Sequence, residues 1–401
     1  MKVVHVCTSD KGGAGIAAVR LHKALLAQGV ESTFLSLYCS GTTPAHACYK
    51  TKSKFTYFQR LKNKLGIPVL VSEKNTIILK SFNANYEIFS FPDSDYEVEQ
   101  HPLLKDADII NLHWVSGFLN YPTFFNAVKK PIVWTLHDMN PLLGGFHYMG
   151  DKVRNEKAMG ELEKSLMKIK ENSYNLSNIN VITPSEWLFN EVKKSIFKNQ
   201  NCQVIYNSLD MTVFKLQSVS VARQFFNLPE NKIIMLFVAQ DTGNFRKGFD
   251  LLKESLNNLH LSDDIVIVSV GAKSSQLNIP KNCIFIDTIS DEKQMSLLYA
   301  AADLYILPSR EDNLPNVMLE SLSCGTPVIA FSNGGMKEII KNGFNGFLAD
   351  DCNAENLTDA ISKGLQFIKE MNRSEISKDA ETLFAPEIQS KAYIKLYQQL
   401  L

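Results

Sequence analysis

Three acidic residues surround the start of a predicted helix in the segment SREDNLPNVMLESLSCGTPVIAF, residues 309–331. Glu311 and Asp312 precede Pro315, and Glu320 follows within the helix. Pro315 suits the first helical position, where its missing N–H and fixed φ are harmless. The N–H groups of such a first turn suit a phosphate. Carboxylates on both sides of an anion site fit a ligand with hydroxyls at its ends and phosphate in its middle, and a nucleotide sugar has that shape.

Strand signals on both sides place this segment in a βαβ unit. Strand formers occupy 303–308, and the next strand begins at 328 after a Cys-Gly-Thr-Pro turn. Asp312 is therefore expected in the loop at the C-terminal edge of a strand, and Glu320 about a turn and a half into a helix over 315–323. An ordinary βαβ unit could also carry these acids, where they would cap the helix and interact with its dipole.

With its PSR, NLPN and CGTPV pieces, the segment resembles the C-terminal signature of retaining GT-B glycosyltransferases (family 4-like, group 1), which carry an E-x7-E motif. The first acid of the motif falls on Asp312, where relatives usually have Glu. Glu311 lies beside it, so either acid could hold the donor sugar. The resemblance covers nearly the whole chain. It implies an α/β GT-B fold, in which two doubly wound Rossmann-like domains face each other across a cleft.

The resemblance also implies the donor contacts of the second domain. Glu320 would accept hydrogen bonds from ribose hydroxyls, and the helix start at Leu314, Pro315 and Asn316 would complete the donor site. The FRKGF segment follows a predicted strand, and its cations Arg246 and Lys247 can neutralise a departing diphosphate. Lys247 matches the diphosphate-clamping Lys of the family. Relatives often have an Arg about six residues earlier, where this chain has Gln240 and Asp241, so Arg246 could substitute for it. A solvated basic pair is the alternative.

Glycines link the first predicted strand to the first helix in the sequence Gly12-Gly13-Ala14-Gly15. Glycine lets a ligand approach the backbone closely, and the resemblance places Gly13 and Gly15 near the donor. The pattern is not G-x-G-x-x-G, because position 18 is Ala, so no dinucleotide site is predicted. A tight turn needed only for packing is the alternative.

Two further groups of the first half follow predicted strands, at the edge where open α/β sheets bind ligands. His137 and Asp138 come after one strand, in a stretch that resembles the His-bearing loop of the family, and His137 is predicted to be catalytic. Trp114, beside His113, ends the preceding strand, and an aromatic ring there could stack on a sugar. Trp114 and Asp138 are predicted to bind the acceptor. A packed Trp with a satisfied His is the alternative. Phe146 stands where many relatives have Cys.

The composition describes a globular chain without bulk charge. Its 401 residues are 45% hydrophobic, which suits two domains with ample core. Lys plus Arg and Asp plus Glu both number 42, so nucleic acid is not indicated as a partner. Seven cysteines without a C-x-x-C favour buried thiols in a reducing compartment over a disulfide framework. The N-terminus reads as a strand and no apolar run reaches the ~18 residues that span a bilayer, so a cytoplasmic location is expected.

Short apolar runs alternate with helix-length segments, which indicates parallel sheets covered on both faces. The predicted strands are 3–7, 109–114, 132–136, 180–183, 203–206, 233–239, 265–270, 283–286, 304–307 and 328–331. A helix is expected over about 16–28. The polar stretch after 206 marks a boundary between domains at 1–206 and 207–385. A terminal helix over 386–401 would, by resemblance, join the first domain.

Two other patterns bear on partners. Residues 46–72 contain six cations, no acid and several aromatic residues, which could contact an anionic membrane at the inner face or a lipid-linked acceptor, or be a solvated loop and helix. Asp93-Ser94-Asp95 matches the metal-binding D-x-D of another glycosyltransferase fold, but it lies in an irregular stretch. No metal or other cofactor is expected.

Together with the resemblance to this family, these patterns predict a retaining hexosyltransferase. It would move a sugar from a UDP- or GDP-type donor to a glycan or lipid-linked acceptor hydroxyl, in cell-surface polysaccharide synthesis. The retaining outcome and a front-face attack, with the departing diphosphate taking the acceptor proton, follow from the resemblance. The alternatives are a nucleotide-sugar epimerase of GT-B-like fold and a non-catalytic two-lobed sugar-binding protein.

Overall fold

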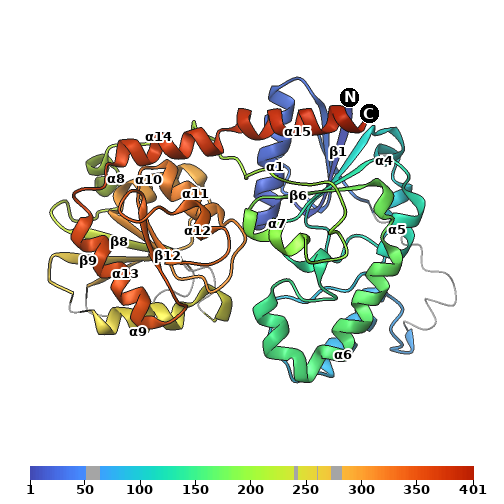
Figure 1. Ribbon diagram of the computed structural model, residues 1–401, viewed down its shortest axis with the longest axis horizontal. Coiled ribbons are helices and arrows are strands. Elements are labelled where there is room, and N and C mark those ends of the chain that lie inside the picture. The colour runs from blue at the N-terminus through green and yellow to red at the C-terminus, as the bar shows by residue number, and fades with distance from the viewer. Residues whose placement is uncertain (51–63, 239–242, 260, 272–281) are drawn as a thin grey trace. The chain divides into compact units, whose positions relative to one another are not determined.

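The chain divides into two compact units in the computed structural model (Figure 1). The structure describes residues 1–50, 64–238, 243–259, 261–271 and 282–401. Unit 1 comprises Met1–Ile205 together with Ser390–Leu401, and unit 2 comprises Tyr206–Gln389. The expected boundaries after 206 and before 386 lie close to these divisions.

Unit 1 is built on a parallel sheet whose described strands follow the order β3-β2-β1-β4-β5-β6-β7. Its strands are β1 (Lys2–Ser9), β2 (Glu31–Tyr38), β3 (His46–Cys48), β4 (Ile109–Leu112), β5 (Ile132–Thr135), β6 (Ile179–Thr183) and β7 (Cys202–Val204). Its helices are α1 (Gly12–Ala27), α3 (Val71–Lys80), α4 (Pro102–Asp106), α5 (Tyr121–Ala127), α6 (Met149–Ser173) and α7 (Glu186–Val192), with short 3-10 turns η1 (Val98–Gln100), η2 (Asn140–Leu142) and η3 (Leu176–Asn178).

Unit 2 repeats this plan with the order β10-β9-β8-β11-β12-β13, again all parallel. Its strands are β8 (Ile233–Val238), β9 (Ile265–Val270), β10 (Cys283–Ile286), β11 (Leu304–Leu307), β12 (Val328–Phe331) and β13 (Gly346–Ala349). Its helices are α8 (Val219–Phe225), η4 (Phe245–Lys247), α9 (Phe249–Asn258), α10 (Glu292–Ala301), α11 (Asn316–Ser323), α12 (Met336–Ile339), α13 (Ala354–Phe367) and α14 (Arg373–Phe384).

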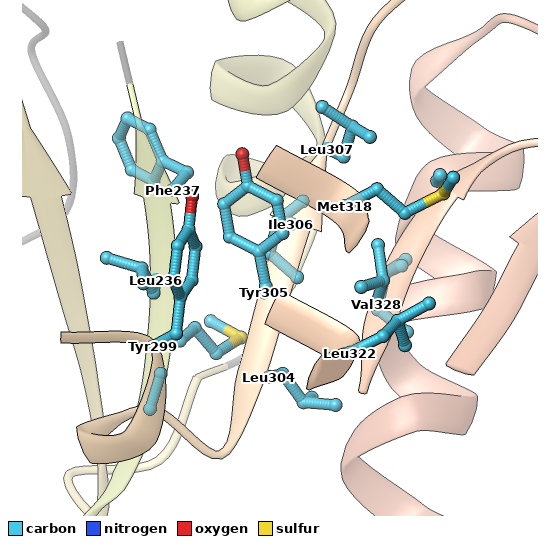
Figure 2. Packing of buried hydrophobic residues seen from close by; sticks show 14 of the residues in the cluster. Leu236, Phe237, Tyr299, Leu304, Tyr305, Ile306, Leu307, Met318, Leu322 and Val328 are labelled. Carbon is cyan, nitrogen blue, oxygen red and sulfur yellow. The ribbon is translucent and has the colours of Figure 1, made fainter. Parts of the chain in front are cut away.

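The central strands of unit 2 are buried on both faces, as their apolar sequences require. Figure 2 shows how β11 and its neighbours fill the core. Tyr305 of β11 and Tyr299 of α10 meet edge to face, with ring centroids 5.5 Å apart. Met318 and Leu322 place one face of α11 in the same core, which fixes the helix that follows the acidic loop.

All ten predicted strands fall on observed strands, and the α/β prediction is confirmed. The sequence prediction missed β2, β3 and β13. β2 has the sequence ESTFLSLY, in which polar residues interrupt the apolar ones, so it shows no apolar run. β3 and β13 are only 3 and 4 residues long, which is too short for a periodic signal.

The terminal helix α15 (Pro386–Leu400) begins in unit 2 and ends in unit 1. Tyr393 and Tyr397 are 0% exposed. The Tyr397 hydroxyl accepts a hydrogen bond of 2.7 Å from Asn111 of β4, and the Tyr393 hydroxyl lies 2.8 Å from the Thr135 hydroxyl of β5. Buried polar partners of this kind fix how the end of the helix packs on the unit 1 sheet.

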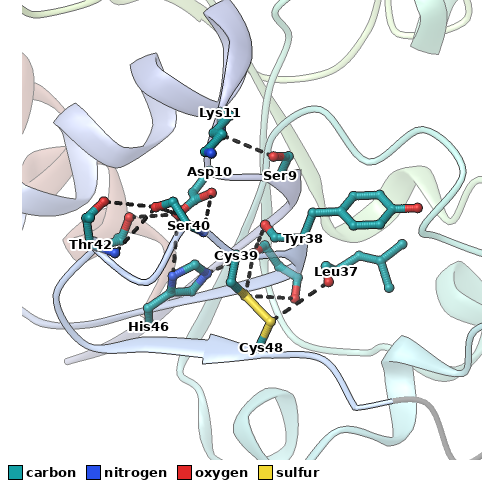
Figure 3. The surroundings of a disulfide bond; sticks show 12 residues. Ser9, Asp10, Lys11, Leu37, Tyr38, Cys39, Ser40, Thr42, His46 and Cys48 are labelled. Atoms are coloured by element: carbon teal, nitrogen blue, oxygen red, sulfur yellow. Dashed lines mark hydrogen bonds and ion pairs between the residues drawn. A yellow bond between two sulfur atoms is a disulfide. The ribbon is translucent and has the colours of Figure 1, made fainter. Parts of the chain in front are cut away.

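One cysteine pair corrects the prediction of thiols alone. Cys39 and Cys48 form a disulfide with Cα atoms 6.0 Å apart, close to Asp10 and Ser40 (Figure 3). Cys39 directly follows β2 and Cys48 ends β3, and parallel pairing of these strands brings the two together. The pairing of these cysteines could not be predicted, because it depends on β3, which has no sequence signal of its own. The other five cysteines are free.

In the described part of the chain, no helix combines the length and apolar character needed to span a bilayer.

Candidate active site

Each sheet has one position where the chain order reverses. In unit 1 this lies between β1 and β4, and in unit 2 between β8 and β11. Loops that leave neighbouring strands in opposite directions leave a crevice at the carboxyl edge of an open α/β sheet, where ligands bind. The loops after β8 and β11 carry the cations and acids singled out from the sequence. The loops after β1 and β4 carry the glycines and Trp114.

Backbone contacts hold the two loops of unit 2 together. The N–H of Arg310 donates to the carbonyl of Arg246 over 2.7 Å. Gly248 has a φ of 67°, and a Cβ there would lie 1.9 Å from the Pro308 carbonyl oxygen. Only glycine allows this approach. The RKG sequence therefore places its two cations directly against the acidic loop.

Asp312 forms the centre of a buried charge cluster. Its carboxylate lies 2.8 Å from Lys247 Nζ and 3.1 Å from Arg246 Nη1. Burial acts to raise the pKa of Asp312, but the charges and hydrogen bonds of Lys247 and Arg246 lower it overall. Glu311 is half-buried and takes part through its carbonyl oxygen, which accepts from Arg246 over 2.9 Å. Of the two acids, Asp312 thus brings its carboxylate to both cations.

Arg310 was not predicted from the sequence, yet it connects the same loops. Its guanidinium makes two hydrogen bonds to Asp250, of 2.7 and 2.5 Å, and a third to the Phe245 carbonyl. It also lies 3.9 Å above the centre of the Phe245 ring. A planar donor pair matching a carboxylate suits this role. The sequence signal was the Arg itself, next to the acids, but its partners could not be read from spacing.

A third loop supports the acidic segment from β12. The N–H of Gly335 donates to the Asn313 carbonyl over 2.7 Å, and a Cβ on Gly334 would lie 1.8 Å from the Asp312 carbonyl oxygen. Because Gly334 has no side chain, the backbone of Asp312 can pass at this short distance.

The helix after the acidic loop begins one residue later than predicted. Pro315 is the N-cap, with φ −67° and ψ 121°, and α11 starts at Asn316. Leu314 is buried behind it. Glu320 lies in α11 and is 9% exposed, and its Oε2 accepts a hydrogen bond of 3.3 Å from the Tyr299 hydroxyl.

In unit 1, the glycine loop opens α1. Gly12 has a φ of 73°, and the helix begins there, so Gly13 and Gly15 lie in its first turn. Gly13 is exposed, whereas Gly15 is buried, and a Cβ on Gly15 would lie 2.4 Å from the Ser9 carbonyl oxygen. Packing alone therefore requires glycine at position 15. Of the two glycines predicted to lie near the donor, only Gly13 is at the surface.

Asp138 organises the loop after β5. Its carboxylate accepts from Trp114 Nε1 over 2.8 Å and from the Asn140 N–H over 2.9 Å, and lies 2.6 Å from His147 Nδ1. Burial acts to raise the pKa of Asp138, but these partners lower it. Asp138 thereby fixes the Trp114 indole. Half-buried His137 lies 3.0 Å from His113, and both line one small pocket with Trp114.

Helix α6 holds this loop in place through two buried side chains. Glu163 accepts from the N–H groups of Gly144 and Gly145 over 2.7 and 2.6 Å. Lys170 is 0% exposed and donates to the carbonyls of Asn140 and Leu143 over 2.6 and 2.8 Å. Neither residue was singled out from the sequence, because their partners are backbone atoms and leave no motif.

Two further sequence patterns, the D-x-D motif and the basic stretch, can be compared with the structure. Asp95 accepts from the N–H groups of Val71 and Ser72 at the start of α3, and Asp93 accepts from the side-chain amide of Asn75 within α3, so both D-x-D carboxylates bind this helix. Gln240, Asp241 and residues 51–63 of the basic stretch 46–72 lie outside the described residues. Of that stretch, Tyr49 packs edge-on against Phe118.

The fold and the paired loops define a GT-B glycosyltransferase. Residues 11–213, about half of the chain, match the model described as Glycosyltransferase Family 4, and residues 219–380 match the one described as Glycosyl transferases group 1. The chain belongs to the group 1, family 4-like GT-B glycosyltransferases and is a transferase. The predicted fold and enzyme class are confirmed.

Two relatives and one solved structure show what this chain is similar to. N-acetyl-alpha-D-glucosaminyl L-malate synthase of Bacillus anthracis is 21% identical over 100% of this chain and 96% of its own. D-inositol 3-phosphate glycosyltransferase of Thermobifida fusca is 22% identical over 86% of this chain and 78% of its own. The Anabaena protein HepE, solved in complex with UDP-glucose, shares the fold with a TM-score of 0.67 and 17% identity over 100% of both chains.

Proposed function

We propose that this enzyme transfers a hexosyl unit from a nucleotide-diphosphate sugar, of UDP or GDP type, to a glycan or lipid-linked acceptor hydroxyl with retention of configuration. The bond from the anomeric carbon to the diphosphate oxygen breaks, and the new bond to the acceptor oxygen forms on the same face. The departing diphosphate takes the acceptor proton. No metal is needed in this proposal, because side-chain cations stabilise the leaving group.

The contact of Arg246 and Lys247 with Asp312 carries the proposal. Arg246 and Lys247 share the single carboxylate of Asp312 at the carboxyl edge of β8 and β11, and a diphosphate at this edge would be attracted by the two cations. The Lys247 side chain is 35% exposed, so its ammonium can contact a ligand. The amides that start α11 add further donors for phosphate oxygens. The binding of UDP-glucose by Anabaena HepE supports this class of donor.

The remaining donor contacts follow from where the acids lie. We assign the sugar hydroxyls to Asp312 and the ribose hydroxyls to Glu320, because a carboxylate accepts hydrogen bonds from hydroxyl groups. His137 and Trp114 of unit 1 are assigned to the acceptor, with Asp138 holding the indole in place.

Surface residues around α3 support a location at the inner face of a membrane. No α3 residue is buried, and Ile77 and Ile78 are 56% and 40% exposed. Leu65 and Ile67, which precede α3, are 67% and 47% exposed. Exposed apolar residues near cations can enter the interface of an anionic bilayer. Such a location fits a lipid-linked acceptor and a role in cell-surface polysaccharide synthesis.

A thermal-shift panel of UDP-, GDP- and ADP-sugars tests the donor assignment. A bound sugar nucleotide at a hundred times its Kd stabilises the fold by about 2.7 kcal/mol, so the correct base shifts the Tm clearly. The Lys247→Ala variant serves as the control and should lose most of this shift. If no nucleotide sugar shifts the wild-type Tm, the donor assignment is wrong.

Product analysis tests the reaction. The transferred sugar should keep the anomeric configuration of the donor, as read from the NMR coupling of its anomeric proton. Conversion of the donor sugar without any acceptor would instead indicate the epimerase.

A further inference from the structure

Three histidines from neighbouring strands form a hydrogen-bonded chain inside unit 1. His5 lies within β1, His113 directly follows β4, and His137 comes shortly after β5. His5 Nδ1 lies 2.9 Å from His113 Nε2, and His113 Nδ1 lies 3.0 Å from His137 Nε2. The rings stack, with centroids 5.2 and 5.3 Å apart. The chain therefore runs from the core of the sheet to half-buried His137.

All three rings are neutral at pH 7. His5 and His113 are 0% and 2% exposed. Burial, and then the charge of His22, lowers the pKa of His5 well below its usual value, and burial followed by the neighbouring histidines does the same for His113. Burial lowers the pKa of His137 to about 4, against the charge of Asp138. A neutral imidazole donates from one nitrogen and accepts on the other.

Two arrangements of protons satisfy both contacts of the chain. In the first, every ring carries its proton on Nδ1, so that His5 donates to His113 and His113 donates to His137. In the second, every ring carries its proton on Nε2, and both hydrogen bonds run in the opposite direction.

His5 Nε2 decides between the two arrangements, because it is buried and has no hydrogen-bond partner within the described ranges. The first arrangement leaves a bare acceptor there, and the second leaves a buried N–H. Buried N–H groups without a partner are rarer in proteins than under-satisfied acceptors. The nearby His22 is engaged elsewhere, since its Nε2 lies 2.8 Å from the Pro44 carbonyl and its Nδ1 lies 2.7 Å from the Ser32 hydroxyl. The first arrangement is therefore favoured.

We propose that His113 is a positioning residue that holds His137 as its Nδ1–H tautomer, with His5 setting the direction of the chain. His137 then has its Nε2 lone pair engaged by His113 and keeps its proton on Nδ1. In this tautomer neither ring nitrogen has a lone pair for the proton of the acceptor hydroxyl, so His137 is not the base. This inference rests on the proposed function, in which His137 contacts the acceptor and the diphosphate takes the proton.

The tautomer can be read directly by ¹⁵N NMR of the histidine-labelled full chain at pH 7.5, with His137 assigned by its absence in His137→Gln. A protonated Nδ1 and an unprotonated Nε2 on His137 are expected. A proton on Nε2 would overturn the proposal. This measurement needs no turnover, so it decides the tautomer even where the proposed function fails.

His113→Asn and His113→Leu form a matched pair, because the two side chains have nearly the same shape and only Asn can donate to His137. His113→Asn should keep the Nδ1–H tautomer and most of the turnover. His113→Leu should lose the tautomer preference and lower kcat on the order of tenfold, the effect of one hydrogen bond, with little change in the donor KM. Equal kcat values and equal spectra for the two variants would contradict the role of His113. Where His113→Leu does not fold, the wild-type spectrum decides.

Discussion

Lys247 and Asp312 are 65 residues apart in sequence, and their ammonium and carboxylate groups lie 2.8 Å apart. One follows β8 and the other follows β11, so the contact joins the two loops at the order reversal of the unit 2 sheet. Asp312 also holds Arg246, and Arg310 joins the same loops through Asp250. The charge pattern of this edge is therefore a property of both loops together.

Lys247→Ala should lower kcat far more than it raises the acceptor KM, because the ammonium is proposed to stabilise charge that develops on the leaving diphosphate. Loss of one such group in other enzymes costs about 10²–10³ in turnover. Steady-state kinetics with the donor found in the thermal-shift panel measure this. Lys253→Ala, at an exposed position of α9, is the control and should stay near wild type. Near-normal turnover of Lys247→Ala would refute the role.

Asp312→Asn and Glu311→Gln should separate the two acids. Asp312→Asn removes the charge that pairs with two cations, so it should lower both turnover and stability, the latter by about 3–5 kcal/mol for a broken buried pair. Glu311→Gln should change turnover less than about threefold, since its carbonyl contact with Arg246 persists. Urea unfolding and kinetics on both variants check this. A larger loss of turnover in Glu311→Gln would reverse the assignment.

The strands and the acidic loop could be predicted because their signals are local. Apolar runs specify the central strands, and the sequence spacing from Asp312 to Glu320 does not depend on tertiary contacts. The partners of Asp138 and Arg310 could not be predicted, since they depend on which loops the sheet order brings together. β3 and the Cys39–Cys48 disulfide were missed for a related reason. A short edge strand is fixed by its neighbour β2 and not by its own sequence.

Arg310→Lys should weaken the donor site without removing a charge. Lys cannot reproduce the two parallel hydrogen bonds to Asp250 or the planar stack on Phe245. We expect the donor KM to rise about tenfold, as for the loss of roughly 1.4 kcal/mol of loop positioning. Kinetics at saturating acceptor measure this. The control is Lys341→Arg, because Lys341 forms an ion pair with Asp379 of α14, away from the donor loops. An unchanged donor KM would show that the loops hold their positions without Arg310.

The buried histidines should make the fold less stable below pH 6.5. The folded-state pKa of His137 lies at about 4, whereas an unfolded histidine titrates near 6.5, so between these values only the unfolded chain takes up the proton. Stability is therefore full above pH 6.5 and falls as the pH drops, by up to about 1.4 kcal/mol per pH unit for each such histidine. Urea unfolding from pH 7.5 to 5 measures the slope. His137→Gln should reduce the slope, and an unchanged slope would contradict the pKa assigned to His137.

Reduction of the Cys39–Cys48 disulfide should destabilise unit 1 and loosen the loop beside Asp10. Ser40 donates to the Asp10 carboxylate through its N–H and its hydroxyl, and Cys39 of the disulfide directly precedes Ser40 (Figure 3). Closing a short loop stabilises a fold by about 2–3 kcal/mol. The Tm of the oxidised wild type should therefore fall when a reductant is added, while that of Cys39→Ser should not respond. Cys202→Ser, which leaves the disulfide intact, should respond like the wild type. If the wild-type Tm is the same with and without reductant while thiol counting shows the bond to be reduced, the disulfide contributes nothing to stability, and the hydrogen bonds of Asp10 alone hold the loop.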